Sequence, residues 1–278
     1  MVKSPAKLNL CLFVLGKRND GFHEILSVVQ KIDLCDIIEI RNADKNSVSF
    51  ESDWEIPKNN TVFISLEYIS SFTKNFYRVR IKKNIPPGAG LGGASSNAGT
   101  ILNVFKNKIP EDKIWNIAEK IGSDVPLFLR KSPSVISGRG EIVSEISIGG
   151  LDSVIFLVVF PNITSITKDV YHRFDTINTD QDKRKLEILK DLINSAGVIK
   201  WDDFKNVLGY NDLETAFLQM YPEAKNVKEF LSRFAKFYLT GSGSSFFSVF
   251  FDEKEAERIY NILKQNFKFI WLVKAFKN

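Results

Sequence analysis

The chain has 278 residues, of which 44% are apolar and 26% charged, with a formal net charge of +5. This length and composition predict a globular protein of one or two domains with a buried core. No apolar run reaches the roughly 20 residues that a membrane-spanning helix needs. The N-terminus also lacks an apolar segment followed by a small-residue cleavage site. We therefore expect a cytoplasmic protein with no membrane partner.

Cysteine and histidine usage argues against a zinc site. Cys11 and Cys35 are the only cysteines, and His23 and His172 the only histidines. None of their spacings is typical of zinc ligands, so we assign no metal-binding residues. Lys and Arg are scattered without a run of five or six basic residues, which favours a locally positive ligand site over a nucleic-acid surface. We expect no nucleic-acid partner.

The first half of the chain mixes strand and helix patterns. Residues 6–14 alternate as a strand, which places Lys7 and Asn9 on one face. Asn60 is expected to cap a helix whose apolar residues follow at helical spacing. Further strands are predicted at 25–32, 37–40, 48–50 and 79–83, and further helices after residue 93 and at 110–121.

The pattern starts again at Val154 with a buried strand. Helices near 185–194, 212–220 and 226–236 are followed by strand 246–251, helix 253–265 and strand 270–276. Helices on an antiparallel sheet are the predicted arrangement of this half. We expect an α+β fold with domains at 1–153 and 154–278 and a cleft between them.

A glycine-rich segment carries the strongest signal for function. Residues 86–97 read Pro-Pro-Gly-Ala-Gly-Leu-Gly-Gly-Ala-Ser-Ser-Asn and lead into a helix. Glycines let the backbone approach a ligand closely, and the free N–H groups of a helix N-terminus favour an anion. The spacing is neither that of the P-loop nor that of the dinucleotide fingerprint. We therefore predict a phosphate-binding loop of another kind.

This loop resembles the phosphate-binding motif of the GHMP kinases (galacto-, homoserine, mevalonate and phosphomevalonate kinases). Segments 4–10, 20–23, 122–126 and 239–244 resemble the other motifs of the family and follow in its order. The resemblance implies a two-domain GHMP kinase fold, ATP bound by the first domain, Mg²⁺ as cofactor and transfer of a phosphoryl group to an alcohol in the inter-domain cleft.

The resemblance also implies catalytic roles. Asp124 would accept the proton of the acceptor hydroxyl. Lys7 would pair with Asp124 and with the transferring phosphate, because a nearby cation keeps the base ionised and offsets phosphoryl charge. Phosphoryl-transfer chemistry calls for Mg²⁺; Ser95, Ser96 and water are candidate ligands, no protein carboxylate is expected, and no ligand is assigned from the sequence. The residues implied for ATP binding are Pro86, Pro87, Gly88, Ala89, Gly90, Leu91, Gly92, Gly93, Ala94, Ser95, Ser96, Asn60 and Lys83.

Within the family, the resemblance is to kinases that phosphorylate the 2-hydroxyl of a cytidine diphosphate-linked small molecule of the non-mevalonate isoprenoid pathway. Phe22 and His23 would hold the cytosine, by stacking and by edge hydrogen bonds. Phe22 replaces the Tyr common in this motif, so the ring is kept and a hydroxyl is lost. The other substrate-binding residues implied are Asn9, Thr167, Tyr171, Thr240 and Gly241. We expect a monomer or a weak homodimer.

Two alternatives remain open on sequence grounds. One is another GHMP kinase of the mevalonate or homoserine type, against which the Gly-Phe-His turn and the Ser-Pro-Ala-Lys-Leu-Asn start argue. The other is a non-catalytic nucleotide-binding or RNA-binding protein on the same fold, suggested by the positive charge. Lys7 and Asp124 argue against it, as does the lack of a basic stripe interleaved with aromatic residues.

Overall fold

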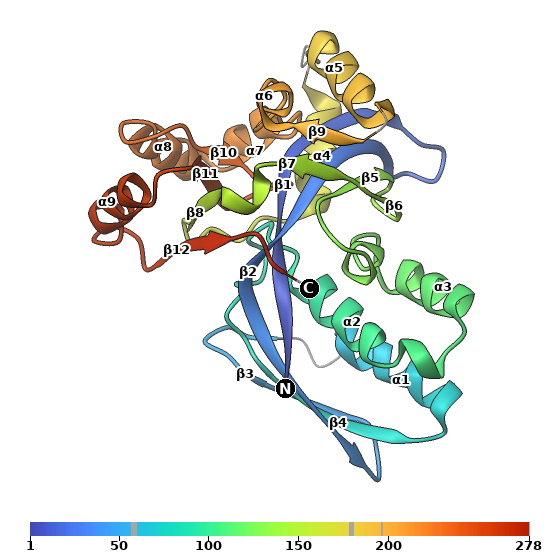
Figure 1. Cartoon of the computed structure of the whole chain (residues 1–278). Helices are drawn as coiled ribbons and strands as arrows, with labels where there is room; N and C mark the ends of the chain where they lie inside the picture. Colours follow the sequence, from blue (N-terminus) through green and yellow to red (C-terminus); the bar gives the residue numbers. More distant parts are fainter. Residues whose placement is uncertain (57–59, 178–180, 196, 278) are drawn as a thin grey trace.

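The computed structural model describes residues 1–56, 60–177, 181–195 and 197–277. A long antiparallel hairpin of β1 (Val2–Lys17) and β2 (His23–Ala43) forms its spine and runs through both halves (Figure 1). The N-terminus and the hairpin's far end lie in the lower half of that view, and the turn between the two strands lies in the upper half.

The sheet of the first half is built on β2. In the described residues the strand order is β3-β4-β2-β5-β6, and β1 also pairs with β2. The helices α1, α2 and α3 lie together beside this sheet (Figure 1). The further strands are β3 (Ser47–Glu51), β4 (Phe76–Lys82), β5 (Ser134–Gly138) and β6 (Ile142–Glu145), and the helices are α1 (Thr61–Thr73), α2 (Gly93–Val104) and α3 (Glu111–Ile121).

The sheet of the second half is antiparallel in the order β10-β11-β8-β12. Its strands are β8 (Ile155–Phe160), β10 (Tyr238–Leu239), β11 (Phe246–Phe250) and β12 (Phe269–Lys274). The helices are α4 (Thr167–Thr176), α5 (Lys183–Asn194), α6 (Trp201–Phe204), α7 (Glu214–Met220), α8 (Pro222–Leu231) and α9 (Glu253–Leu263). A small parallel pair, β7 (Ser147–Gly149) and β9 (Val198–Lys200), and the short 3₁₀ turns η1 (Lys106–Lys108), η2 (Pro126–Leu129) and η3 (Leu151–Ser153) complete the described fold. The predicted α+β class is confirmed.

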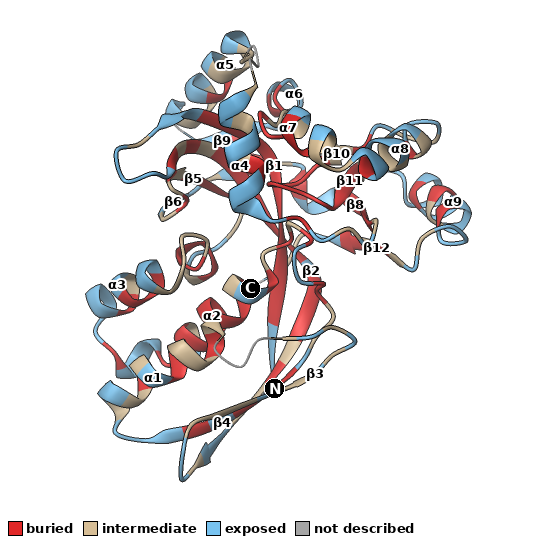
Figure 2. Cartoon of the chain, turned by 180° about the vertical axis from the view of Figure 1, so that it is seen from behind, coloured by how far each residue is buried: buried red, intermediate tan, exposed pale blue. Residues whose placement is uncertain are grey.

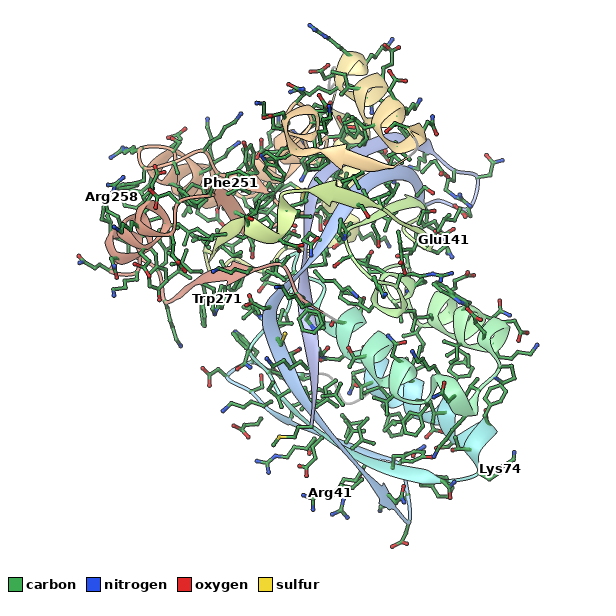
Figure 3. All side chains as sticks on the ribbon, in the orientation of Figure 1. Arg41, Lys74, Glu141, Phe251, Arg258 and Trp271 are labelled. Carbon is green, nitrogen blue, oxygen red and sulfur yellow. The ribbon has the colours of Figure 1, made fainter. Side chains whose placement is uncertain are left out.

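Local sequence features explain where several of these helices begin and which face they bury. Asn60 caps α1, where its side-chain oxygen accepts from the N–H groups of Val62 and Phe63 at 3.1 Å each. Such a cap satisfies donors that the first helical turn leaves unpaired. In α3, Ile114 and Ile117 are buried while the opposite face is charged. Charged residues such as Arg41, Lys74 and Arg258 project from the outer surface (Figure 3).

One apolar core joins the two halves. Leu8, Leu10 and Phe13 of β1 pack in the same buried cluster as Phe156 of β8 and Phe247 of β11. Figure 2 shows the buried run along the hairpin where it crosses the molecule. Backbone bonds reinforce this contact, because Leu12 N donates to Tyr210 O at 2.8 Å and Gly209 N donates to Leu10 O at 2.6 Å.

Two differences from the predicted elements have clear causes. The strands predicted at 25–32 and 37–40 are one strand, β2, because the buried Asp36 that interrupts the apolar pattern is satisfied by hydrogen bonds. Helix α4 was not predicted, because its apolar residues Val170, Tyr171 and Phe174 form only a short stripe among polar neighbours. In the described residues no helix has the length and apolar character to cross a membrane.

We predict that Phe13→Ala lowers the free energy of unfolding by about 3–5 kcal/mol, because it leaves a cavity in the shared core. Phe13 is fully buried and stacks on Tyr210 with ring centroids 4.4 Å apart. Phe76→Ala, at a side chain 48% exposed on β4, is the control and should stay within about 0.5 kcal/mol. Urea unfolding measures both, and equal losses would contradict the shared core.

Candidate active site

The strand β1 brings two buried polar side chains to one place. Lys7 is 6% exposed and Asn9 4% exposed, and the ammonium group of Lys7 donates to the side-chain oxygen of Asn9. The Asn9 amide nitrogen donates onward to Ser27 Oγ at 2.8 Å. Desolvation lowers the pKa of Lys7, and the negative charge of Asp124 opposes this shift. Lys7 and Asp124 are therefore electrostatically coupled in the folded protein.

Asp124 reaches the same place from a loop that precedes η2. A Cβ built on Gly140 would lie 3.3 Å from Asp124 Oδ1, so the turn between β5 and β6 borders the carboxylate. Asp124 is half-buried, and within the described residues its carboxylate makes no hydrogen bond. A carboxylate with no hydrogen bond of its own, whose charge acts on a lysine, is a candidate for a general base.

A second glycine loop closes around Lys7 from the C-terminal half. The backbone N–H of Asn9 donates to Thr240 Oγ1 at 2.9 Å. Gly241 has φ +59°, and a Cβ there would lie 3.1 Å from Lys7 Nζ and 3.2 Å from Asn9 Oδ1. Asn211 holds this loop in place by donating to Gly241 O at 2.8 Å. A side chain at position 241 would therefore crowd Lys7 and Asn9, and the positive φ also favours glycine there.

The two glycine loops touch each other. Gly90 has φ +75°, and a Cβ on it would lie 2.6 Å from Gly243 O and 2.7 Å from Thr240 O. Lys7 N donates to Leu91 O, and Ser245 N donates to Ala89 O, both at 3.0 Å. Strand β1 therefore carries Lys7 into a backbone cradle that both halves of the chain build.

The N-terminus of α2 is open. Gly92 precedes the helix with φ +71° and offers no side-chain cap, and the first turn contains no acidic residue. Ser95 is half-buried, and its hydroxyl makes no hydrogen bond within the described residues. Unpaired N–H groups and the helix dipole favour an anion here. Of the loop, Pro87, Gly88 and Ala94 are exposed, Gly90 and Gly92 half-buried, and Pro86, Ala89, Leu91 and Gly93 buried.

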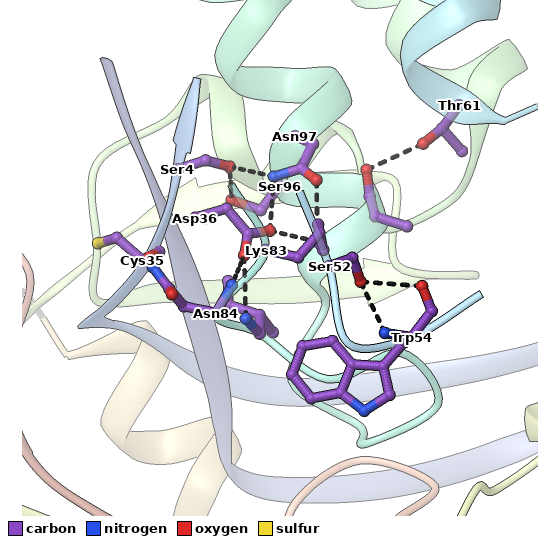
Figure 4. Close-up of polar contacts among 12 residues, drawn as sticks. Ser4, Cys35, Asp36, Ser52, Trp54, Thr61, Lys83, Asn84, Ser96 and Asn97 are labelled. Atoms are coloured by element: carbon purple, nitrogen blue, oxygen red, sulfur yellow. Dashed lines mark hydrogen bonds and ion pairs between the residues drawn. The ribbon is translucent and has the colours of Figure 1, made fainter. Parts of the chain in front are cut away.

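A buried ionic network lies behind the loop (Figure 4). Asp36 is fully buried and pairs with the ammonium group of Lys83. The carboxylate also accepts from Asn84 N at 2.7 Å, Ile85 N at 2.9 Å and Asn97 Nδ2 at 2.9 Å. Desolvation lowers the pKa of Lys83, and Asp36 opposes the shift. The network ties β2 to the loop entry and to α2.

Two residues implied for ATP binding point into this network. The hydroxyl of Ser96 is buried and lies 2.8 Å from Ser4 Oγ. Lys83 has a side chain 5% exposed that also donates to Asn97 Oδ1 at 3.0 Å. Lys83 borders a cavity of about 700 Å³, and Asn60 a second one of about 470 Å³. Trp54 borders both cavities, so the implied adenine residues flank one indole ring.

The residues implied for the acceptor divide into two groups. His23 is buried and stacks on Tyr171 of α4 with ring centroids 4.8 Å apart. Burial, together with the charges of Asp124 and Asp212, raises the pKa of Tyr171. Phe22 is 49% exposed, and the guanidinium carbon of Arg139 lies 4.9 Å from its ring centroid. The two rings therefore have different neighbours, Tyr171 for His23 and Arg139 for Phe22.

Helix α4 also approaches the second glycine loop. Thr167 Oγ1 lies 2.9 Å from Ser242 Oγ, and Ser165 Oγ donates to Ser242 O at 2.8 Å. Ser165 N in turn donates to Gly88 O at 3.0 Å. The start of α4 is thus fixed against both glycine loops, and Thr167 faces the loop that surrounds Lys7.

Comparison with known proteins identifies the family of this site. The model "GHMP kinases N terminal domain" matches residues 60–132, and "GHMP kinases C terminal" matches residues 186–268. The 4-diphosphocytidyl-2-C-methyl-D-erythritol kinase of Thermotoga maritima is 37% identical over 253 residues, 89% of this chain and 90% of the relative. This chain belongs to the GHMP kinase family.

Other relatives agree. The kinase of the same name from Caldanaerobacter subterraneus is 33% identical over 99% of this GHMP kinase and 96% of its own length. The crystal structure of a 4-(cytidine 5'-diphospho)-2C-methyl-D-erythritol kinase superposes with a TM-score of 0.75 at 24% identity, covering 99% of both chains. A homoserine kinase from Cytophaga hutchinsonii superposes with a TM-score of 0.64 at 17% identity, covering 99% of this chain and 95% of that one. These structures show that the fold is shared.

Sequence reasoning missed three polar residues of this GHMP kinase. Asp36 could have been noticed as a carboxylate inside the apolar run 34–38, since such a residue needs a partner when buried. Arg139 lies in a glycine-flanked turn, which gave no local signal for its place above Phe22. Asp175 lies in α4 and bonds His23 at 2.7 Å, 152 residues away in sequence. No local pattern could have indicated that contact.

We predict that Lys83→Met lowers the free energy of unfolding by roughly 3 kcal/mol, because it leaves the Asp36 charge buried without its cation. The matched control is Lys82→Met, whose side chain is 59% exposed and should change stability by no more than about 0.5 kcal/mol. Urea unfolding and the KM for ATP are measured on both. A Lys83 variant that raises this KM but stays as stable as the control would make Lys83 a nucleotide contact and not a structural ion-pair partner.

Proposed function

We propose that this GHMP kinase transfers the γ-phosphoryl group of ATP to the 2-hydroxyl of 4-diphosphocytidyl-2-C-methyl-D-erythritol. The observation that carries the proposal is that relatives named for this kinase match about nine tenths of the chain or more at 33–37% identity. The site geometry supports it, because Lys7 and Asn9 lie against the glycine loop at Gly241, and the unbonded Asp124 carboxylate acts electrostatically on Lys7.

The chemistry of transfer falls to Asp124 and Lys7. The Asp124 carboxylate orients the acceptor hydroxyl and takes its proton as the new P–O bond forms, while the bond from the γ-phosphorus to the bridging oxygen breaks and ADP leaves. The Lys7 ammonium stabilises negative charge on the transferring phosphoryl oxygens, and burial strengthens that interaction. Asn9 holds the ammonium group through its side-chain oxygen.

The nucleotide is held by the first half of the chain, residues 1–153, with 154–278 as the second domain. The uncapped first turn of α2 and loop 86–93 donate N–H groups to the phosphates. The structure supports this placement through the open end of α2 at Gly92. Asn60 and Lys83 lie farther along, toward the adenine, with Trp54 between their cavities.

Mg²⁺ fits this site as a companion of the nucleotide. The described residues contain no group of three or more His, Cys, Asp or Glu side chains that could hold a metal ion. Mg²⁺ in kinases is commonly bound through substrate phosphates and water. The Ser95 hydroxyl at the start of α2 is the protein ligand that we assign, since the Ser96 hydroxyl is engaged with Ser4. The ion would neutralise charge on the β- and γ-phosphates.

The acceptor is a cytidine diphosphate-linked small molecule. Its reacting hydroxyl lies between Asp124 and the Thr240–Gly241 loop, with Asn9 beneath, and its base lies toward His23, Phe22 and Tyr171. Thr167 lines the path between these ends through its contact with Ser242. We infer a monomer or weak homodimer in the cytoplasm. The free, buried Cys11 and Cys35 suit a reducing compartment.

Purified protein with ATP and Mg²⁺ tests the proposal directly. Phosphorylation of the cytidine diphosphate-linked alcohol is measured beside mevalonate, homoserine and the uridine analogue of the first substrate. We expect kcat/KM to be highest for the cytidine compound. A higher value for mevalonate or homoserine would move the chain to another branch of the family. ATP binding without turnover of any acceptor would make it a non-catalytic nucleotide-binding protein.

We predict that Asp124→Asn lowers kcat by roughly 10²–10⁴ while the KM for ATP stays within about twofold, because the amide keeps the shape and cannot accept the proton. Steady-state kinetics with saturating acceptor measures this. Asp112→Asn, at a carboxylate 67% exposed on α3, is the control and should keep wild-type turnover. Near-normal kcat in the Asp124 variant would remove this residue from proton transfer.

A further inference from the structure

Helix α4 is joined to the β1–β2 hairpin by one carboxylate. Asp175, in the last turn of α4, places Oδ1 2.7 Å from His23 Nε2 and Oδ2 2.6 Å from Lys17 Nζ. Lys17 ends β1 and His23 begins β2, so both partners sit at the turn of the hairpin. Each oxygen of Asp175 is therefore engaged by a donor from the other half of the chain.

The surroundings of Asp175 favour its ionised form, which can only accept hydrogen bonds. Desolvation would raise the pKa of its carboxyl group, but hydrogen bonds from Lys17 and His23 outweigh it and lower the pKa below the ordinary value. An ionised carboxylate only accepts hydrogen bonds. The proton of a neutral His23 ring must then lie on Nε2, because a bare nitrogen facing the carboxylate would make no bond.

The same helix fixes the plane of the ring. Tyr171 stacks on His23 at 4.8 Å, with 26° between the planes, and Phe174 meets its edge at 6.3 Å. His23 is 8% exposed. Across the described part of the chain, Nδ1 has no hydrogen-bond partner, and it is not among the fully buried unpaired atoms. A neutral ring with its proton on Nε2 thus presents a single oriented acceptor, Nδ1, that is unpaired and not fully buried.

We propose that Asp175 is a positioning residue that makes the enzyme select cytosine, by fixing His23 in the Nε2–H form so that Nδ1 accepts a hydrogen bond from the base's amino group. This inference rests on the proposed function, in which the acceptor carries a cytidine. Uracil has an oxygen in place of that amino group. Two acceptors would then face each other, and a buried polar pair left unmatched discriminates strongly.

Asp175→Asn tests the kinetic side of the proposal. The amide can donate to Nε2 and shift the ring proton to Nδ1, which turns the acceptor into a donor. We expect the KM for the cytidine substrate to rise roughly tenfold. The preference for the cytidine compound over its uridine analogue should narrow by a similar factor. The KM for ATP should be unchanged, because Asp175 does not border the glycine-rich loop.

Two further variants serve as controls. Asp169→Asn changes an exposed carboxylate in the first turn of the same helix, and we expect it to keep the wild-type base preference. Asp175→Glu keeps an ionised acceptor and should restore most of the preference. A general loss of packing in α4 would instead affect the Glu and Asn variants alike and would raise the KM for both bases equally.

Nitrogen-15 NMR of histidine-labelled protein reads the tautomer without any substrate. The chain has two histidines, so His172→Gln, at an exposed position, leaves His23 as the single signal. We expect a protonated Nε2 and an unprotonated Nδ1 at neutral pH, with the pattern reversed in Asp175→Asn. A protonated Nδ1 in the parent protein would overturn the proposal.

The outcomes separate this inference from the proposed function. A parent enzyme that does not phosphorylate the cytidine substrate refutes the proposed function, and with it the cytosine role, even if NMR finds the Nε2–H form. A parent enzyme that prefers cytidine, with an Asp175→Asn variant of unchanged base preference, refutes the role of Asp175 alone.

Discussion

The close backbone contact between two glycine loops is the constraint on which the site depends. Loop 86–93 follows β4, and loop 240–243 precedes β11, so the two come from different halves of the chain. They meet where Gly90 lies against the carbonyl groups of Thr240 and Gly243, a distance that no side chain at position 90 would allow. Because they meet there, the loops enclose Lys7 on β1, and Gly92 at the uncapped start of α2 lies against the same lysine.

The second constraint is that a buried charge needs a compensating partner. Lys83 and Lys7, the two lysines near loop 86–93, are compensated in different ways. Lys83 is paired with the fully buried Asp36, whose remaining capacity is used by backbone N–H groups and Asn97. That ion pair fixes the loop entry. Lys7 has the side-chain oxygen of Asn9 as its hydrogen-bond acceptor and Asp124 as a nearby charge. A buried cation without a full counter-charge attracts anionic ligands, which suits a group that must stabilise phosphoryl oxygens.

In the region proposed for the acceptor substrate, side-chain contacts join the two halves of the chain, in place of the backbone contacts that join the glycine loops. Asp175, His23 and Tyr171 link α4 to the hairpin turn, while Thr167 links the start of the same helix to the second glycine loop. One short, mostly exposed helix thus contacts both the region assigned to the base and the region assigned to the reacting hydroxyl. Val170, Tyr171 and Phe174 also pack the helix on the second core cluster, so polar and apolar contacts together attach α4 to the fold.

The sequence by itself determined what depends on neighbours along the chain. The cap at Asn60, the glycine entry to α2, the strand face shared by Lys7 and Asn9, and the antiparallel second sheet all follow from local spacing and backbone preference. The order of glycine motifs was enough to indicate the family. Tertiary structure decided which way Lys83 and Ser96 point, that β2 runs unbroken past Asp36, that Arg139 lies over Phe22, and that α4 exists. The reason is physical: each of these depends on a partner distant in sequence, such as Asp36, 47 residues from Lys83, or Asp175, 152 residues from His23.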